Sequence, residues 1–272
     1  MSTNTKSNIC FLDTEFNATD YPDKNEGFQE IIEIGAVVFQ EGKVIDTFSR
    51  YCNLSGSHTI TKRCKSITGI TNNILEEKGI PFIQAMNDFI DFTNRHNIKI
   101  IYAFGPADAI EMRRTAKLNH ANKEIYNIIN SIKNVYPIFK KNLELHYLFS
   151  LYDICRICNV DHDKENRAHN AIYDAEDTGK AFYNMRRNHI NKTMLNELNT
   201  HKFNVNIYRN ARNVKHENIR PISGLNSDFI EELELIFENA KSKVSEPVVQ
   251  ALHDDMMRII GRPDLELGEE DL

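Results

Sequence analysis

The sequence predicts an α/β fold, in which a mixed sheet of an antiparallel meander plus parallel strands is flanked by helices. Three strand-like apolar segments follow one another closely up to Cys52, and such a succession is typical of an antiparallel meander. From Phe82 onward the apolar spacing alternates between the helical and the extended pattern. This alternation is typical of parallel strands joined by helices. A C-terminal helical extension is expected after the sheet.

Each predicted element has a local signal. The run Ile9 to Leu12 is short, apolar and of strand type. EIIEIGAVVFQ and KVIDTFSRYC are two further strands, and Glu41-Gly42 between them indicates a hairpin. The remaining elements are a helix over Phe82 to Arg95, a strand over Lys99 to Phe104, a helix from Asp108 onward, a strand at SIKNVYPIF, and helices over Leu143 to Cys158 and Asn170 to Arg187.

The chain is expected to divide into three parts. Residues 1–190 form the α/β domain. Residues 191–225 are polar and asparagine-rich and end near a Pro and a Gly, as in a linker or a basic arm, and Arg209 to Arg220 is a candidate nucleic-acid contact. Residues 226–272 form a helical extension with an acidic tail. Its two helices each carry an apolar stripe, which predicts a protein partner or self-association.

Composition limits the functional classes. The hydrophobic fraction is 41%, and no apolar run approaches the roughly 20 residues of a membrane helix, so no membrane association is expected. The start, MSTNTKSNICFLD, lacks the layout of a secretory signal, and we expect a cytoplasmic protein. Its five cysteines then suit reduced thiols. The formal net charge of -6 argues only weakly against a nucleic-acid partner, because a metal site needs carboxylates.

Acidic residues stand at three element ends. Asp13 and Glu15 follow the first strand and, being two apart, project to the same side. Asp108 follows a strand and begins a helix, where open α/β sheets bind ligands. Asp174 lies in a predicted helix and His169 just ahead of it. Taken singly, these are a solvated pair, a helix cap and a surface histidine; their convergence on one architecture favours a site.

Such a cluster requires cations. Two carboxylates about 4 Å apart repel by roughly 4 kcal/mol at an effective dielectric near 20. Oxygen donors without thiolate favour Mg²⁺ or Mn²⁺ over zinc. Two such ions can activate water and stabilise the departing oxygen in an in-line displacement, which is phosphodiester hydrolysis. A free imidazole titrates at about pH 6.5, so His169 can take the proton from that water if it comes within hydrogen-bonding reach.

Five motifs in order carry a resemblance to a known family: FLDTEFN, EIIEIGAVV, SITGIT, AFGPAD and HNAIYDAEDT. Over about residues 8–188 the chain resembles the DEDDh 3′-5′ exonucleases of the DnaQ-like superfamily, whose fold is ribonuclease H-like. The resemblance implies that Asp13, Glu15, Asp108 and Asp174 bind two divalent cations and that His169 is the general base. It departs from the family's usual pattern at Phe104, where many relatives have Trp, and at Tyr136-Pro137.

The resemblance also implies a substrate. The chain is expected to act on the 3′ end of a nucleic acid and to release nucleoside monophosphates. RNA is favoured over DNA as the substrate. A DNA proofreading-type exonuclease and a catalytically silent binding module are the alternatives. Phe16 could stack on a terminal base or pack in the core. The residues expected to contact the substrate are Thr14, Phe16, Thr68, Gly69, Ile70 and Phe104.

Two further features have plain interpretations. Cys155 and Cys158 have the spacing of a redox or zinc pair, but they lie in an apolar helix without a second pair, so we interpret them as core thiols and expect no metal there. The basic run Thr61 to Lys65 precedes SITGIT. It is either a phosphate contact or a solvated loop.

Overall fold

A computed structural model describes residues 8–19, 28–56, 58–162 and 170–200 continuously. Beyond these it describes only positions 202, 234, 235, 237, 238, 249, 253, 254, 256 and 257. The chain divides into two compact units, Met1–Met194 and Leu195–Leu272.

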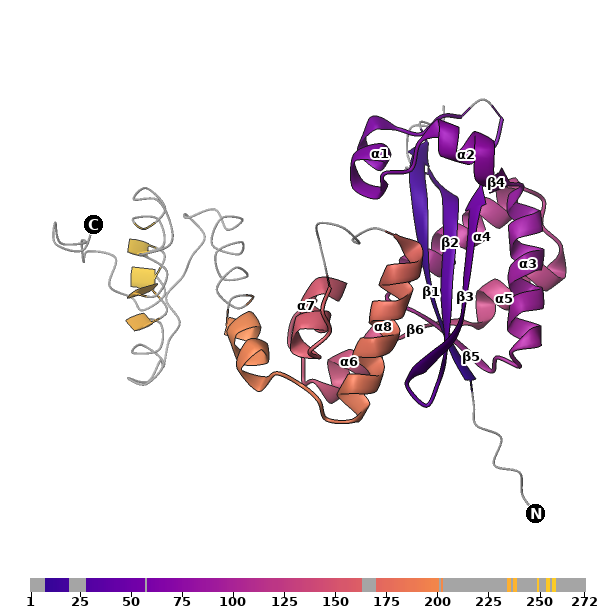
Figure 1. Ribbon diagram of the computed structural model, residues 1–272. Helices are drawn as coiled ribbons and strands as arrows, with labels where there is room; N and C mark the ends of the chain where they lie inside the picture. The colour runs from indigo at the N-terminus through magenta and orange to yellow at the C-terminus, as the bar shows by residue number, and fades with distance from the viewer. Residues whose placement is uncertain are drawn as a thin grey trace, which may run out of the picture. The chain divides into compact units, whose positions relative to one another are not determined.

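The first unit is built on a six-stranded mixed sheet with the order β4-β3-β2-β1-β5-β6 (Figure 1). The long strands β1, β2 and β3 pair antiparallel, whereas β5 runs parallel to β1. The predicted meander with parallel strands added to it is therefore confirmed. The strands are β1 (Asn8–Thr19), β2 (Phe28–Gln40), β3 (Lys43–Cys52), β4 (Gly79–Ile80), β5 (Ile100–Ala103) and β6 (Ile132–Asn134).

The turn between β2 and β3 explains why these two strands form a hairpin. Glu41 and Gly42 both have positive φ angles, 53° and 84°. Two-residue turns with this backbone match the right-handed twist of the paired strands. The hairpin that the sequence predicted at this dipeptide is confirmed.

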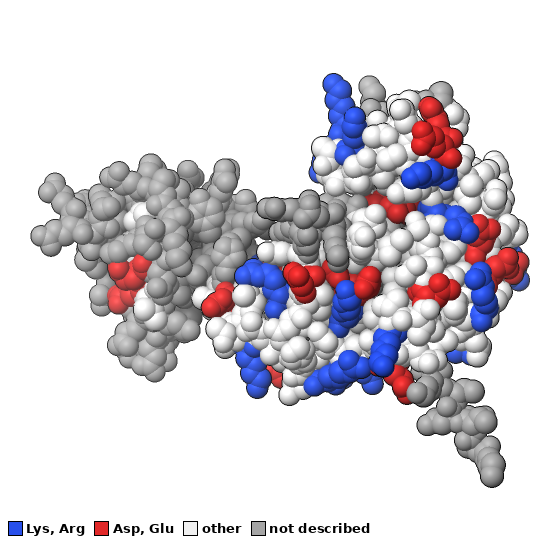
Figure 2. Space-filling view, viewed as in Figure 1, with Lys and Arg blue, Asp and Glu red and all other residues white. Residues whose placement is uncertain are grey.

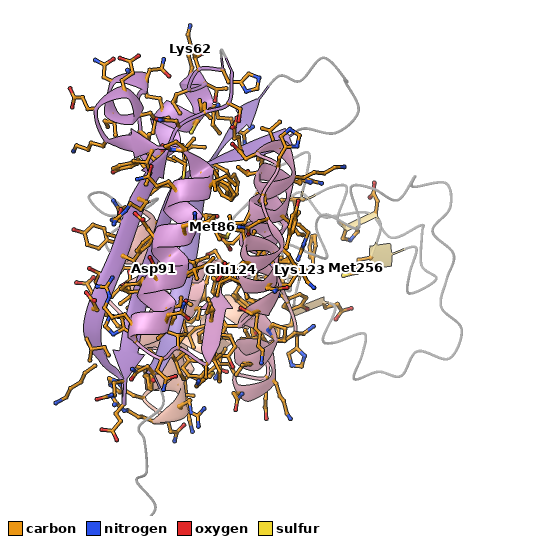
Figure 3. All side chains as sticks on the ribbon, turned by 90° about the vertical axis from the view of Figure 1, so that its right-hand side faces the viewer. Lys62, Met86, Asp91, Lys123, Glu124 and Met256 are labelled. Carbon is orange, nitrogen blue, oxygen red and sulfur yellow. The ribbon has the colours of Figure 1, made fainter. Side chains whose placement is uncertain are left out.

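Side chains alternate across the sheet and create two cores. Cys10 and Leu12 of β1 belong to a large apolar core with α3 (Phe82–Arg95), α4 (Ala107–Leu118) and α5 (Lys123–Ser131). Figure 3 labels Met86, a fully buried member of this core, and Asp91, an exposed residue of the same helix. Because successive side chains of a strand point to opposite faces, the odd-numbered residues of β1 point away from this core.

The opposite face is covered by α8 (Ala171–Arg186), which contacts both β1 and β2. Phe11 packs there against Phe39 and Phe182, with ring centroids 5.5 Å and 5.4 Å away. In Figure 1, α6 (Tyr136–Asn142), α7 (Leu151–Ile157) and α8 lie on one side of the sheet, and α3 and α5 lie on the other. Asp13 and Glu15 have the same parity as Phe11, so β1 turns them toward α8.

Two predicted elements were wrong in part. The segment SIKNVYPIF is strand only over Ile132–Asn134 and then becomes α6, because Pro137 suits the first turn of a helix. The helix expected over residues 143–158 is confined to α7, which begins at a capping box between Ser150 and Asp153. Three short or medium helices were not predicted: α1 (Lys62–Thr68), α2 (Asn72–Lys78) and α5.

The second unit is described at a few positions, all helical. The rings of Phe237 and His253 lie 5.5 Å apart, so two of its segments pack against each other. Residues 192–200, where the sequence predicted the start of a linker, are helical. The basic arm over Arg209 to Arg220 and the acidic tail lie outside the described residues. Within the described part of the chain, no helix combines the length and the apolarity needed to cross a membrane.

Candidate active site

Strand β1 carries two acids toward α8. The sequence predicted Asp13 and Glu15 just beyond a strand ending at Leu12, but β1 continues to Thr19 and contains both. Asp13 pairs with Gly35 of β2 and Glu15 pairs with Glu33. The register of the two strands shifts between Glu15 and Phe16, which marks a bulge. Bulges often lie beside active sites because they redirect a side chain.

Helix α8 brings the third acid close because β2 has a glycine where the helix crosses it. A Cβ atom on Gly35 would lie 2.4 Å from the carbonyl carbon of Ala171 and 2.5 Å from the amide nitrogen of Ile172. Only a glycine therefore allows this approach. Asp174 lies in the first turn of α8, and carboxylate oxygens of Asp13, Glu15 and Asp174 all lie within 4.8 Å of one another.

Asp108, in the first turn of α4, is held beside this group by hydrogen bonds from β1. Its Oδ1 accepts from the amide and from the hydroxyl of Thr14, each at 2.9 Å. The residue is 6% exposed, and its charge raises the pKa of Asp13. All four acids singled out in the sequence therefore come together, although Asp108 is not one of the three whose oxygens lie within 4.8 Å.

The electrostatics of the four acids favour a bound cation. Burial, followed by the charges of Asp108 and Asp174, raises the pKa of Asp13 well above its usual range. Burial and Asp174 raise the pKa of Glu15 to about 8. Burial raises the pKa of Asp108 to about 6, although its bonds to Thr14 oppose the shift. The raised pKa values mean that negative charge is unfavourable in this group without a cation, so an oxygen-seeking divalent ion fits the donor set.

A fifth acid, Glu33, was not recognised in the sequence. It is 1% exposed and accepts a hydrogen bond from the Ser49 hydroxyl at 3.3 Å. Burial raises the pKa of Glu33, and the Ala171 backbone opposes this shift. Its charge raises the pKa of both Asp13 and Glu15. Glu33 thus connects β2 to the start of α8. The available signal was its spacing two residues before Gly35, which places both on the face that meets α8.

The segment after β3 forms the other side of the site and is tied to the sheet by buried polar residues. Asn17, which is fully buried, donates to the carbonyl of Thr59 and accepts from the amide of Thr61. Glu30, also fully buried, accepts from the amide of Ser55 at 2.7 Å. These bonds fix the segment leading into α1.

The SITGIT residues lie at the end of α1 and the start of α2. Gly69 is exposed and caps α1 with a φ of 72°. The Thr68 hydroxyl accepts from the amide of Ile70 at 3.1 Å. Ile70 is 3% exposed and packs with Ile32 and Leu75. Ile70 therefore exposes very little surface to a substrate.

The two aromatic candidates are partly buried. Phe16 packs against the main core, and its carbonyl lies 3.8 Å from the Cys64 sulfur of α1. Phe104 lies edge-on to Tyr136, with ring centroids 5.6 Å apart. Both residues have packing partners, and both keep some exposed surface.

Acidic and basic side chains are interspersed on the surface, and one group of each lies near the site. Acidic atoms are visible between α1 and the upper end of α8, and basic side chains stand over α1 (Figure 2). Lys62, Arg63 and Lys65 of α1 are exposed, and Lys62 stands at the upper end of Figure 3. The basic run, for which the sequence left a phosphate contact and a solvated loop as alternatives, is thus part of a short helix on this side of the molecule. His169 belongs to segment 163–169, which lies outside the described residues.

Comparison with known protein families gives one match to most of the first unit. The family model RNase_T, described as an exonuclease, matches residues 10–182. A PolC-type DNA polymerase III of Halalkalibacterium halodurans is 28% identical over 188 residues, covering 66% of this chain and 12% of the polymerase. The probable 3′-5′ exonuclease KapD of Bacillus subtilis is 31% identical over 118 residues, covering 43% of this chain and 56% of KapD.

A solved structure supports the same fold. The nuclease domain of 3′hExo, a DEDDh family member bound to rAMP, superposes with a TM-score of 0.57 at 19% identity. The superposition covers 69% of this chain and 96% of that domain. The chain spans only a small part of the polymerase and about half of KapD.

Proposed function

This chain belongs to the RNase_T exonuclease family, as a nuclease of the DEDDh type, and on that premise we propose that it removes nucleoside monophosphates from the 3′ end of a nucleic acid. The observation that carries the proposal is the convergence of Asp13, Glu15 and Asp174, with Asp108 held beside them by Thr14. Carboxylates brought so close are costly without a cation. A cluster with only oxygen ligands suits Mg²⁺ or Mn²⁺.

Each residue of the site has a proposed role. Asp13, Glu15, Asp108 and Asp174 bind two divalent cations, which when present polarise the phosphate and stabilise the departing oxygen. Thr14 orients Asp108 through two hydrogen bonds. His169 takes the proton from the attacking water. Thr68, Gly69 and the backbone of Ile70 border the nucleotide on the α1 side, and Phe16 and Phe104 offer their exposed ring surface to it.

RNA is the substrate that we favour, and single-stranded DNA is the second candidate. The likeness to the nuclease domain bound to rAMP supports RNA. The likeness to PolC-type polymerases supports a DNA proofreading-type activity instead. The two differ at the 2′-hydroxyl, which a protein must contact in order to tell RNA from DNA.

The proposal is tested by digestion of matched oligonucleotides. RNA and DNA of one sequence, single- and double-stranded and labelled at the 5′ end, are incubated with the full chain and Mg²⁺ or Mn²⁺. We expect a ladder of products shortened from the 3′ end, with RNA degraded faster. Equal rates, or faster DNA degradation, would remove the RNA preference. If none of the oligonucleotides is shortened, the chain is not a nuclease under these conditions, and the alternative of a catalytically silent binding module is favoured.

A further inference from the structure

A second group of potential ligands lies outside the carboxylate cluster. Cys155 comes from α7, His162 from the segment after it, and Asp177 from the middle of α8. One donor atom from each lies within 4.8 Å of the other two. The Nδ1 atom of His162 is 2.8 Å from Oδ2 of Asp177. None of the three residues belongs to the carboxylate cluster.

All three side chains are shielded from solvent. Cys155 is fully buried, and the side chains of His162 and Asp177 are each 7% exposed. A cavity of about 350 Å³ next to the group is lined in part by Val160, Asp161 and Lys180. Lys180 also contacts Asp177, with its Nζ atom 3.7 Å from Oδ1.

The donor set differs in kind from that of the carboxylate cluster. A sulfur, an imidazole nitrogen and a carboxylate oxygen are the ligand types that proteins use for zinc, whereas Mg²⁺ seeks oxygen only. Burial raises the pKa of the Cys155 thiol, so the thiol is protonated until an ion displaces its proton. The alternative is a core thiol beside a hydrogen-bonded His-Asp pair, which needs no ion.

We propose that Cys155, His162 and Asp177 bind a transition-metal ion of the zinc type, with a water molecule as the fourth ligand. Such an ion links α7 to α8 through one ligand from each helix. It also fixes His162, from which the chain continues into segment 163–169, and that segment contains His169.

Cobalt is the probe of choice because thiolate ligation gives Co²⁺ an intense near-ultraviolet charge-transfer band. The full chain, stripped of metal with a chelator and kept reduced, is titrated with Co²⁺ in the presence of excess Mg²⁺. We expect one equivalent of Co²⁺ per chain to produce the full band. Added Zn²⁺ should abolish the band by displacing Co²⁺. The carboxylate cluster has no sulfur ligand and cannot produce this signal. The absence of the band in the wild-type chain overturns the proposal whether or not the chain is a nuclease.

Two cysteine variants assign the ligand. Cys155→Ala should lose the band, whereas Cys158→Ala should keep it, because Cys158 is equally buried but is not a member of the group. Retention in Cys155→Ala, or loss in Cys158→Ala, overturns the assignment. If Cys155→Ala does not fold by circular dichroism, His162→Asn takes its place and should weaken Co²⁺ binding at least ~10-fold. Unchanged Co²⁺ affinity in that variant overturns the proposal.

Discussion

Helix α8 contributes one acid to each of two clusters, which differ in their charge and in their ligand types. Asp174 joins Asp13 and Glu15, and Asp177, three residues later, joins Cys155 and His162. The first cluster collects like charges, so the pKa values of Asp13 and Glu15 are raised. In the second, the Asp177 carboxylate already has a hydrogen-bond partner in His162. The first cluster therefore depends on a cation for charge balance, whereas the ion that we propose in the second would act by linking α7 to α8.

The largest expected effect is the loss of nuclease activity in Asp13→Asn. An amide there binds a cation poorly, and loss of a direct ligand should cost more than the ~100-fold seen for outer-shell residues. The initial rate of oligonucleotide digestion measures this loss. Asp91→Asn is the matched control, because Asp91 is an exposed residue on the outside of α3. It should keep the wild-type rate.

A second readout tests the same site without turnover. Mn²⁺ at about 100 times its dissociation constant should stabilise the wild-type fold by roughly 2.7 kcal/mol, and this gain should disappear in Asp13→Asn. Thermal unfolding with and without Mn²⁺ measures it. Equal stabilisation of the variant would mean that the cation binds elsewhere in the chain.

The contrast between the clusters also explains what the sequence could predict. Asp108 and Asp174 lie in the first turns of helices, and Asp13 and Glu15 lie two apart within a strand. Helix starts and strand parity determine where such residues point. Cys155 and Cys158 lacked a second pair, and the interpretation as core thiols was reasonable on spacing alone. His162 and Asp177 join Cys155 only through the packing of α7 on α8, and no spacing rule encodes that packing.

The same distinction holds for the fold. Long amphipathic elements such as α3 were predicted with their observed bounds, because apolar periodicity over four turns is unambiguous. The short helix α6 was taken for a strand, since a few apolar residues around Pro137 fit either pattern. Glu33 was missed because its spacing two residues before Gly35 becomes informative only once Gly35 is known to lie against the start of α8.

The next effect in size is the disruption of the carboxylate cluster by a methyl group at Gly35. In Gly35→Ala the added Cβ would collide with the backbone of Ala171 and Ile172. Backbone atoms cannot move aside cheaply, so we expect a loss of roughly 1–3 kcal/mol in the free energy of unfolding. Asp174 should shift with α8, and the digestion rate should fall further than stability alone explains.

Gly105→Ala is the control for Gly35→Ala in chemical denaturation, since a Cβ at Gly105 meets nothing within 4 Å. Its free energy of unfolding should match that of the wild type. If Gly35→Ala were as stable as Gly105→Ala, α8 would not depend on close contact with β2, and the account of how Asp174 reaches the site would be wrong.

The raised pKa values predict an unusual pH dependence for the metal-free protein. The pKa of Glu15 rises from 4.5 to about 8, so between these values the folded state holds a proton that the unfolded state has lost. The free energy of unfolding should therefore fall as pH rises from 6 to 8, by at most about 1.4 kcal/mol per pH unit for one proton. Urea denaturation in the presence of chelator measures this slope.

Glu15→Gln should flatten that slope, because an amide does not titrate. Stabilisation by Mn²⁺ should grow with pH over the same range, since the cation competes with the bound proton. A slope that is identical in wild type and Glu15→Gln would show that this carboxyl is not the group responsible.

The smallest expected effect concerns the hydrogen bond that orients Asp108. Thr14→Val keeps the shape of the side chain and the amide donor but removes the hydroxyl that donates to Oδ1 at 2.9 Å. Loss of such an orienting bond should lower the digestion rate about 10-fold. Because the same bond lowers the pKa of Asp108, the acid limb of the pH-rate profile should also move to higher pH. Thr14→Ser retains the hydroxyl and should keep both the rate and the profile. A rate loss in Thr14→Val without any shift of the acid limb would mean that Thr14 acts by packing, and that Asp108 does not need its hydroxyl for orientation.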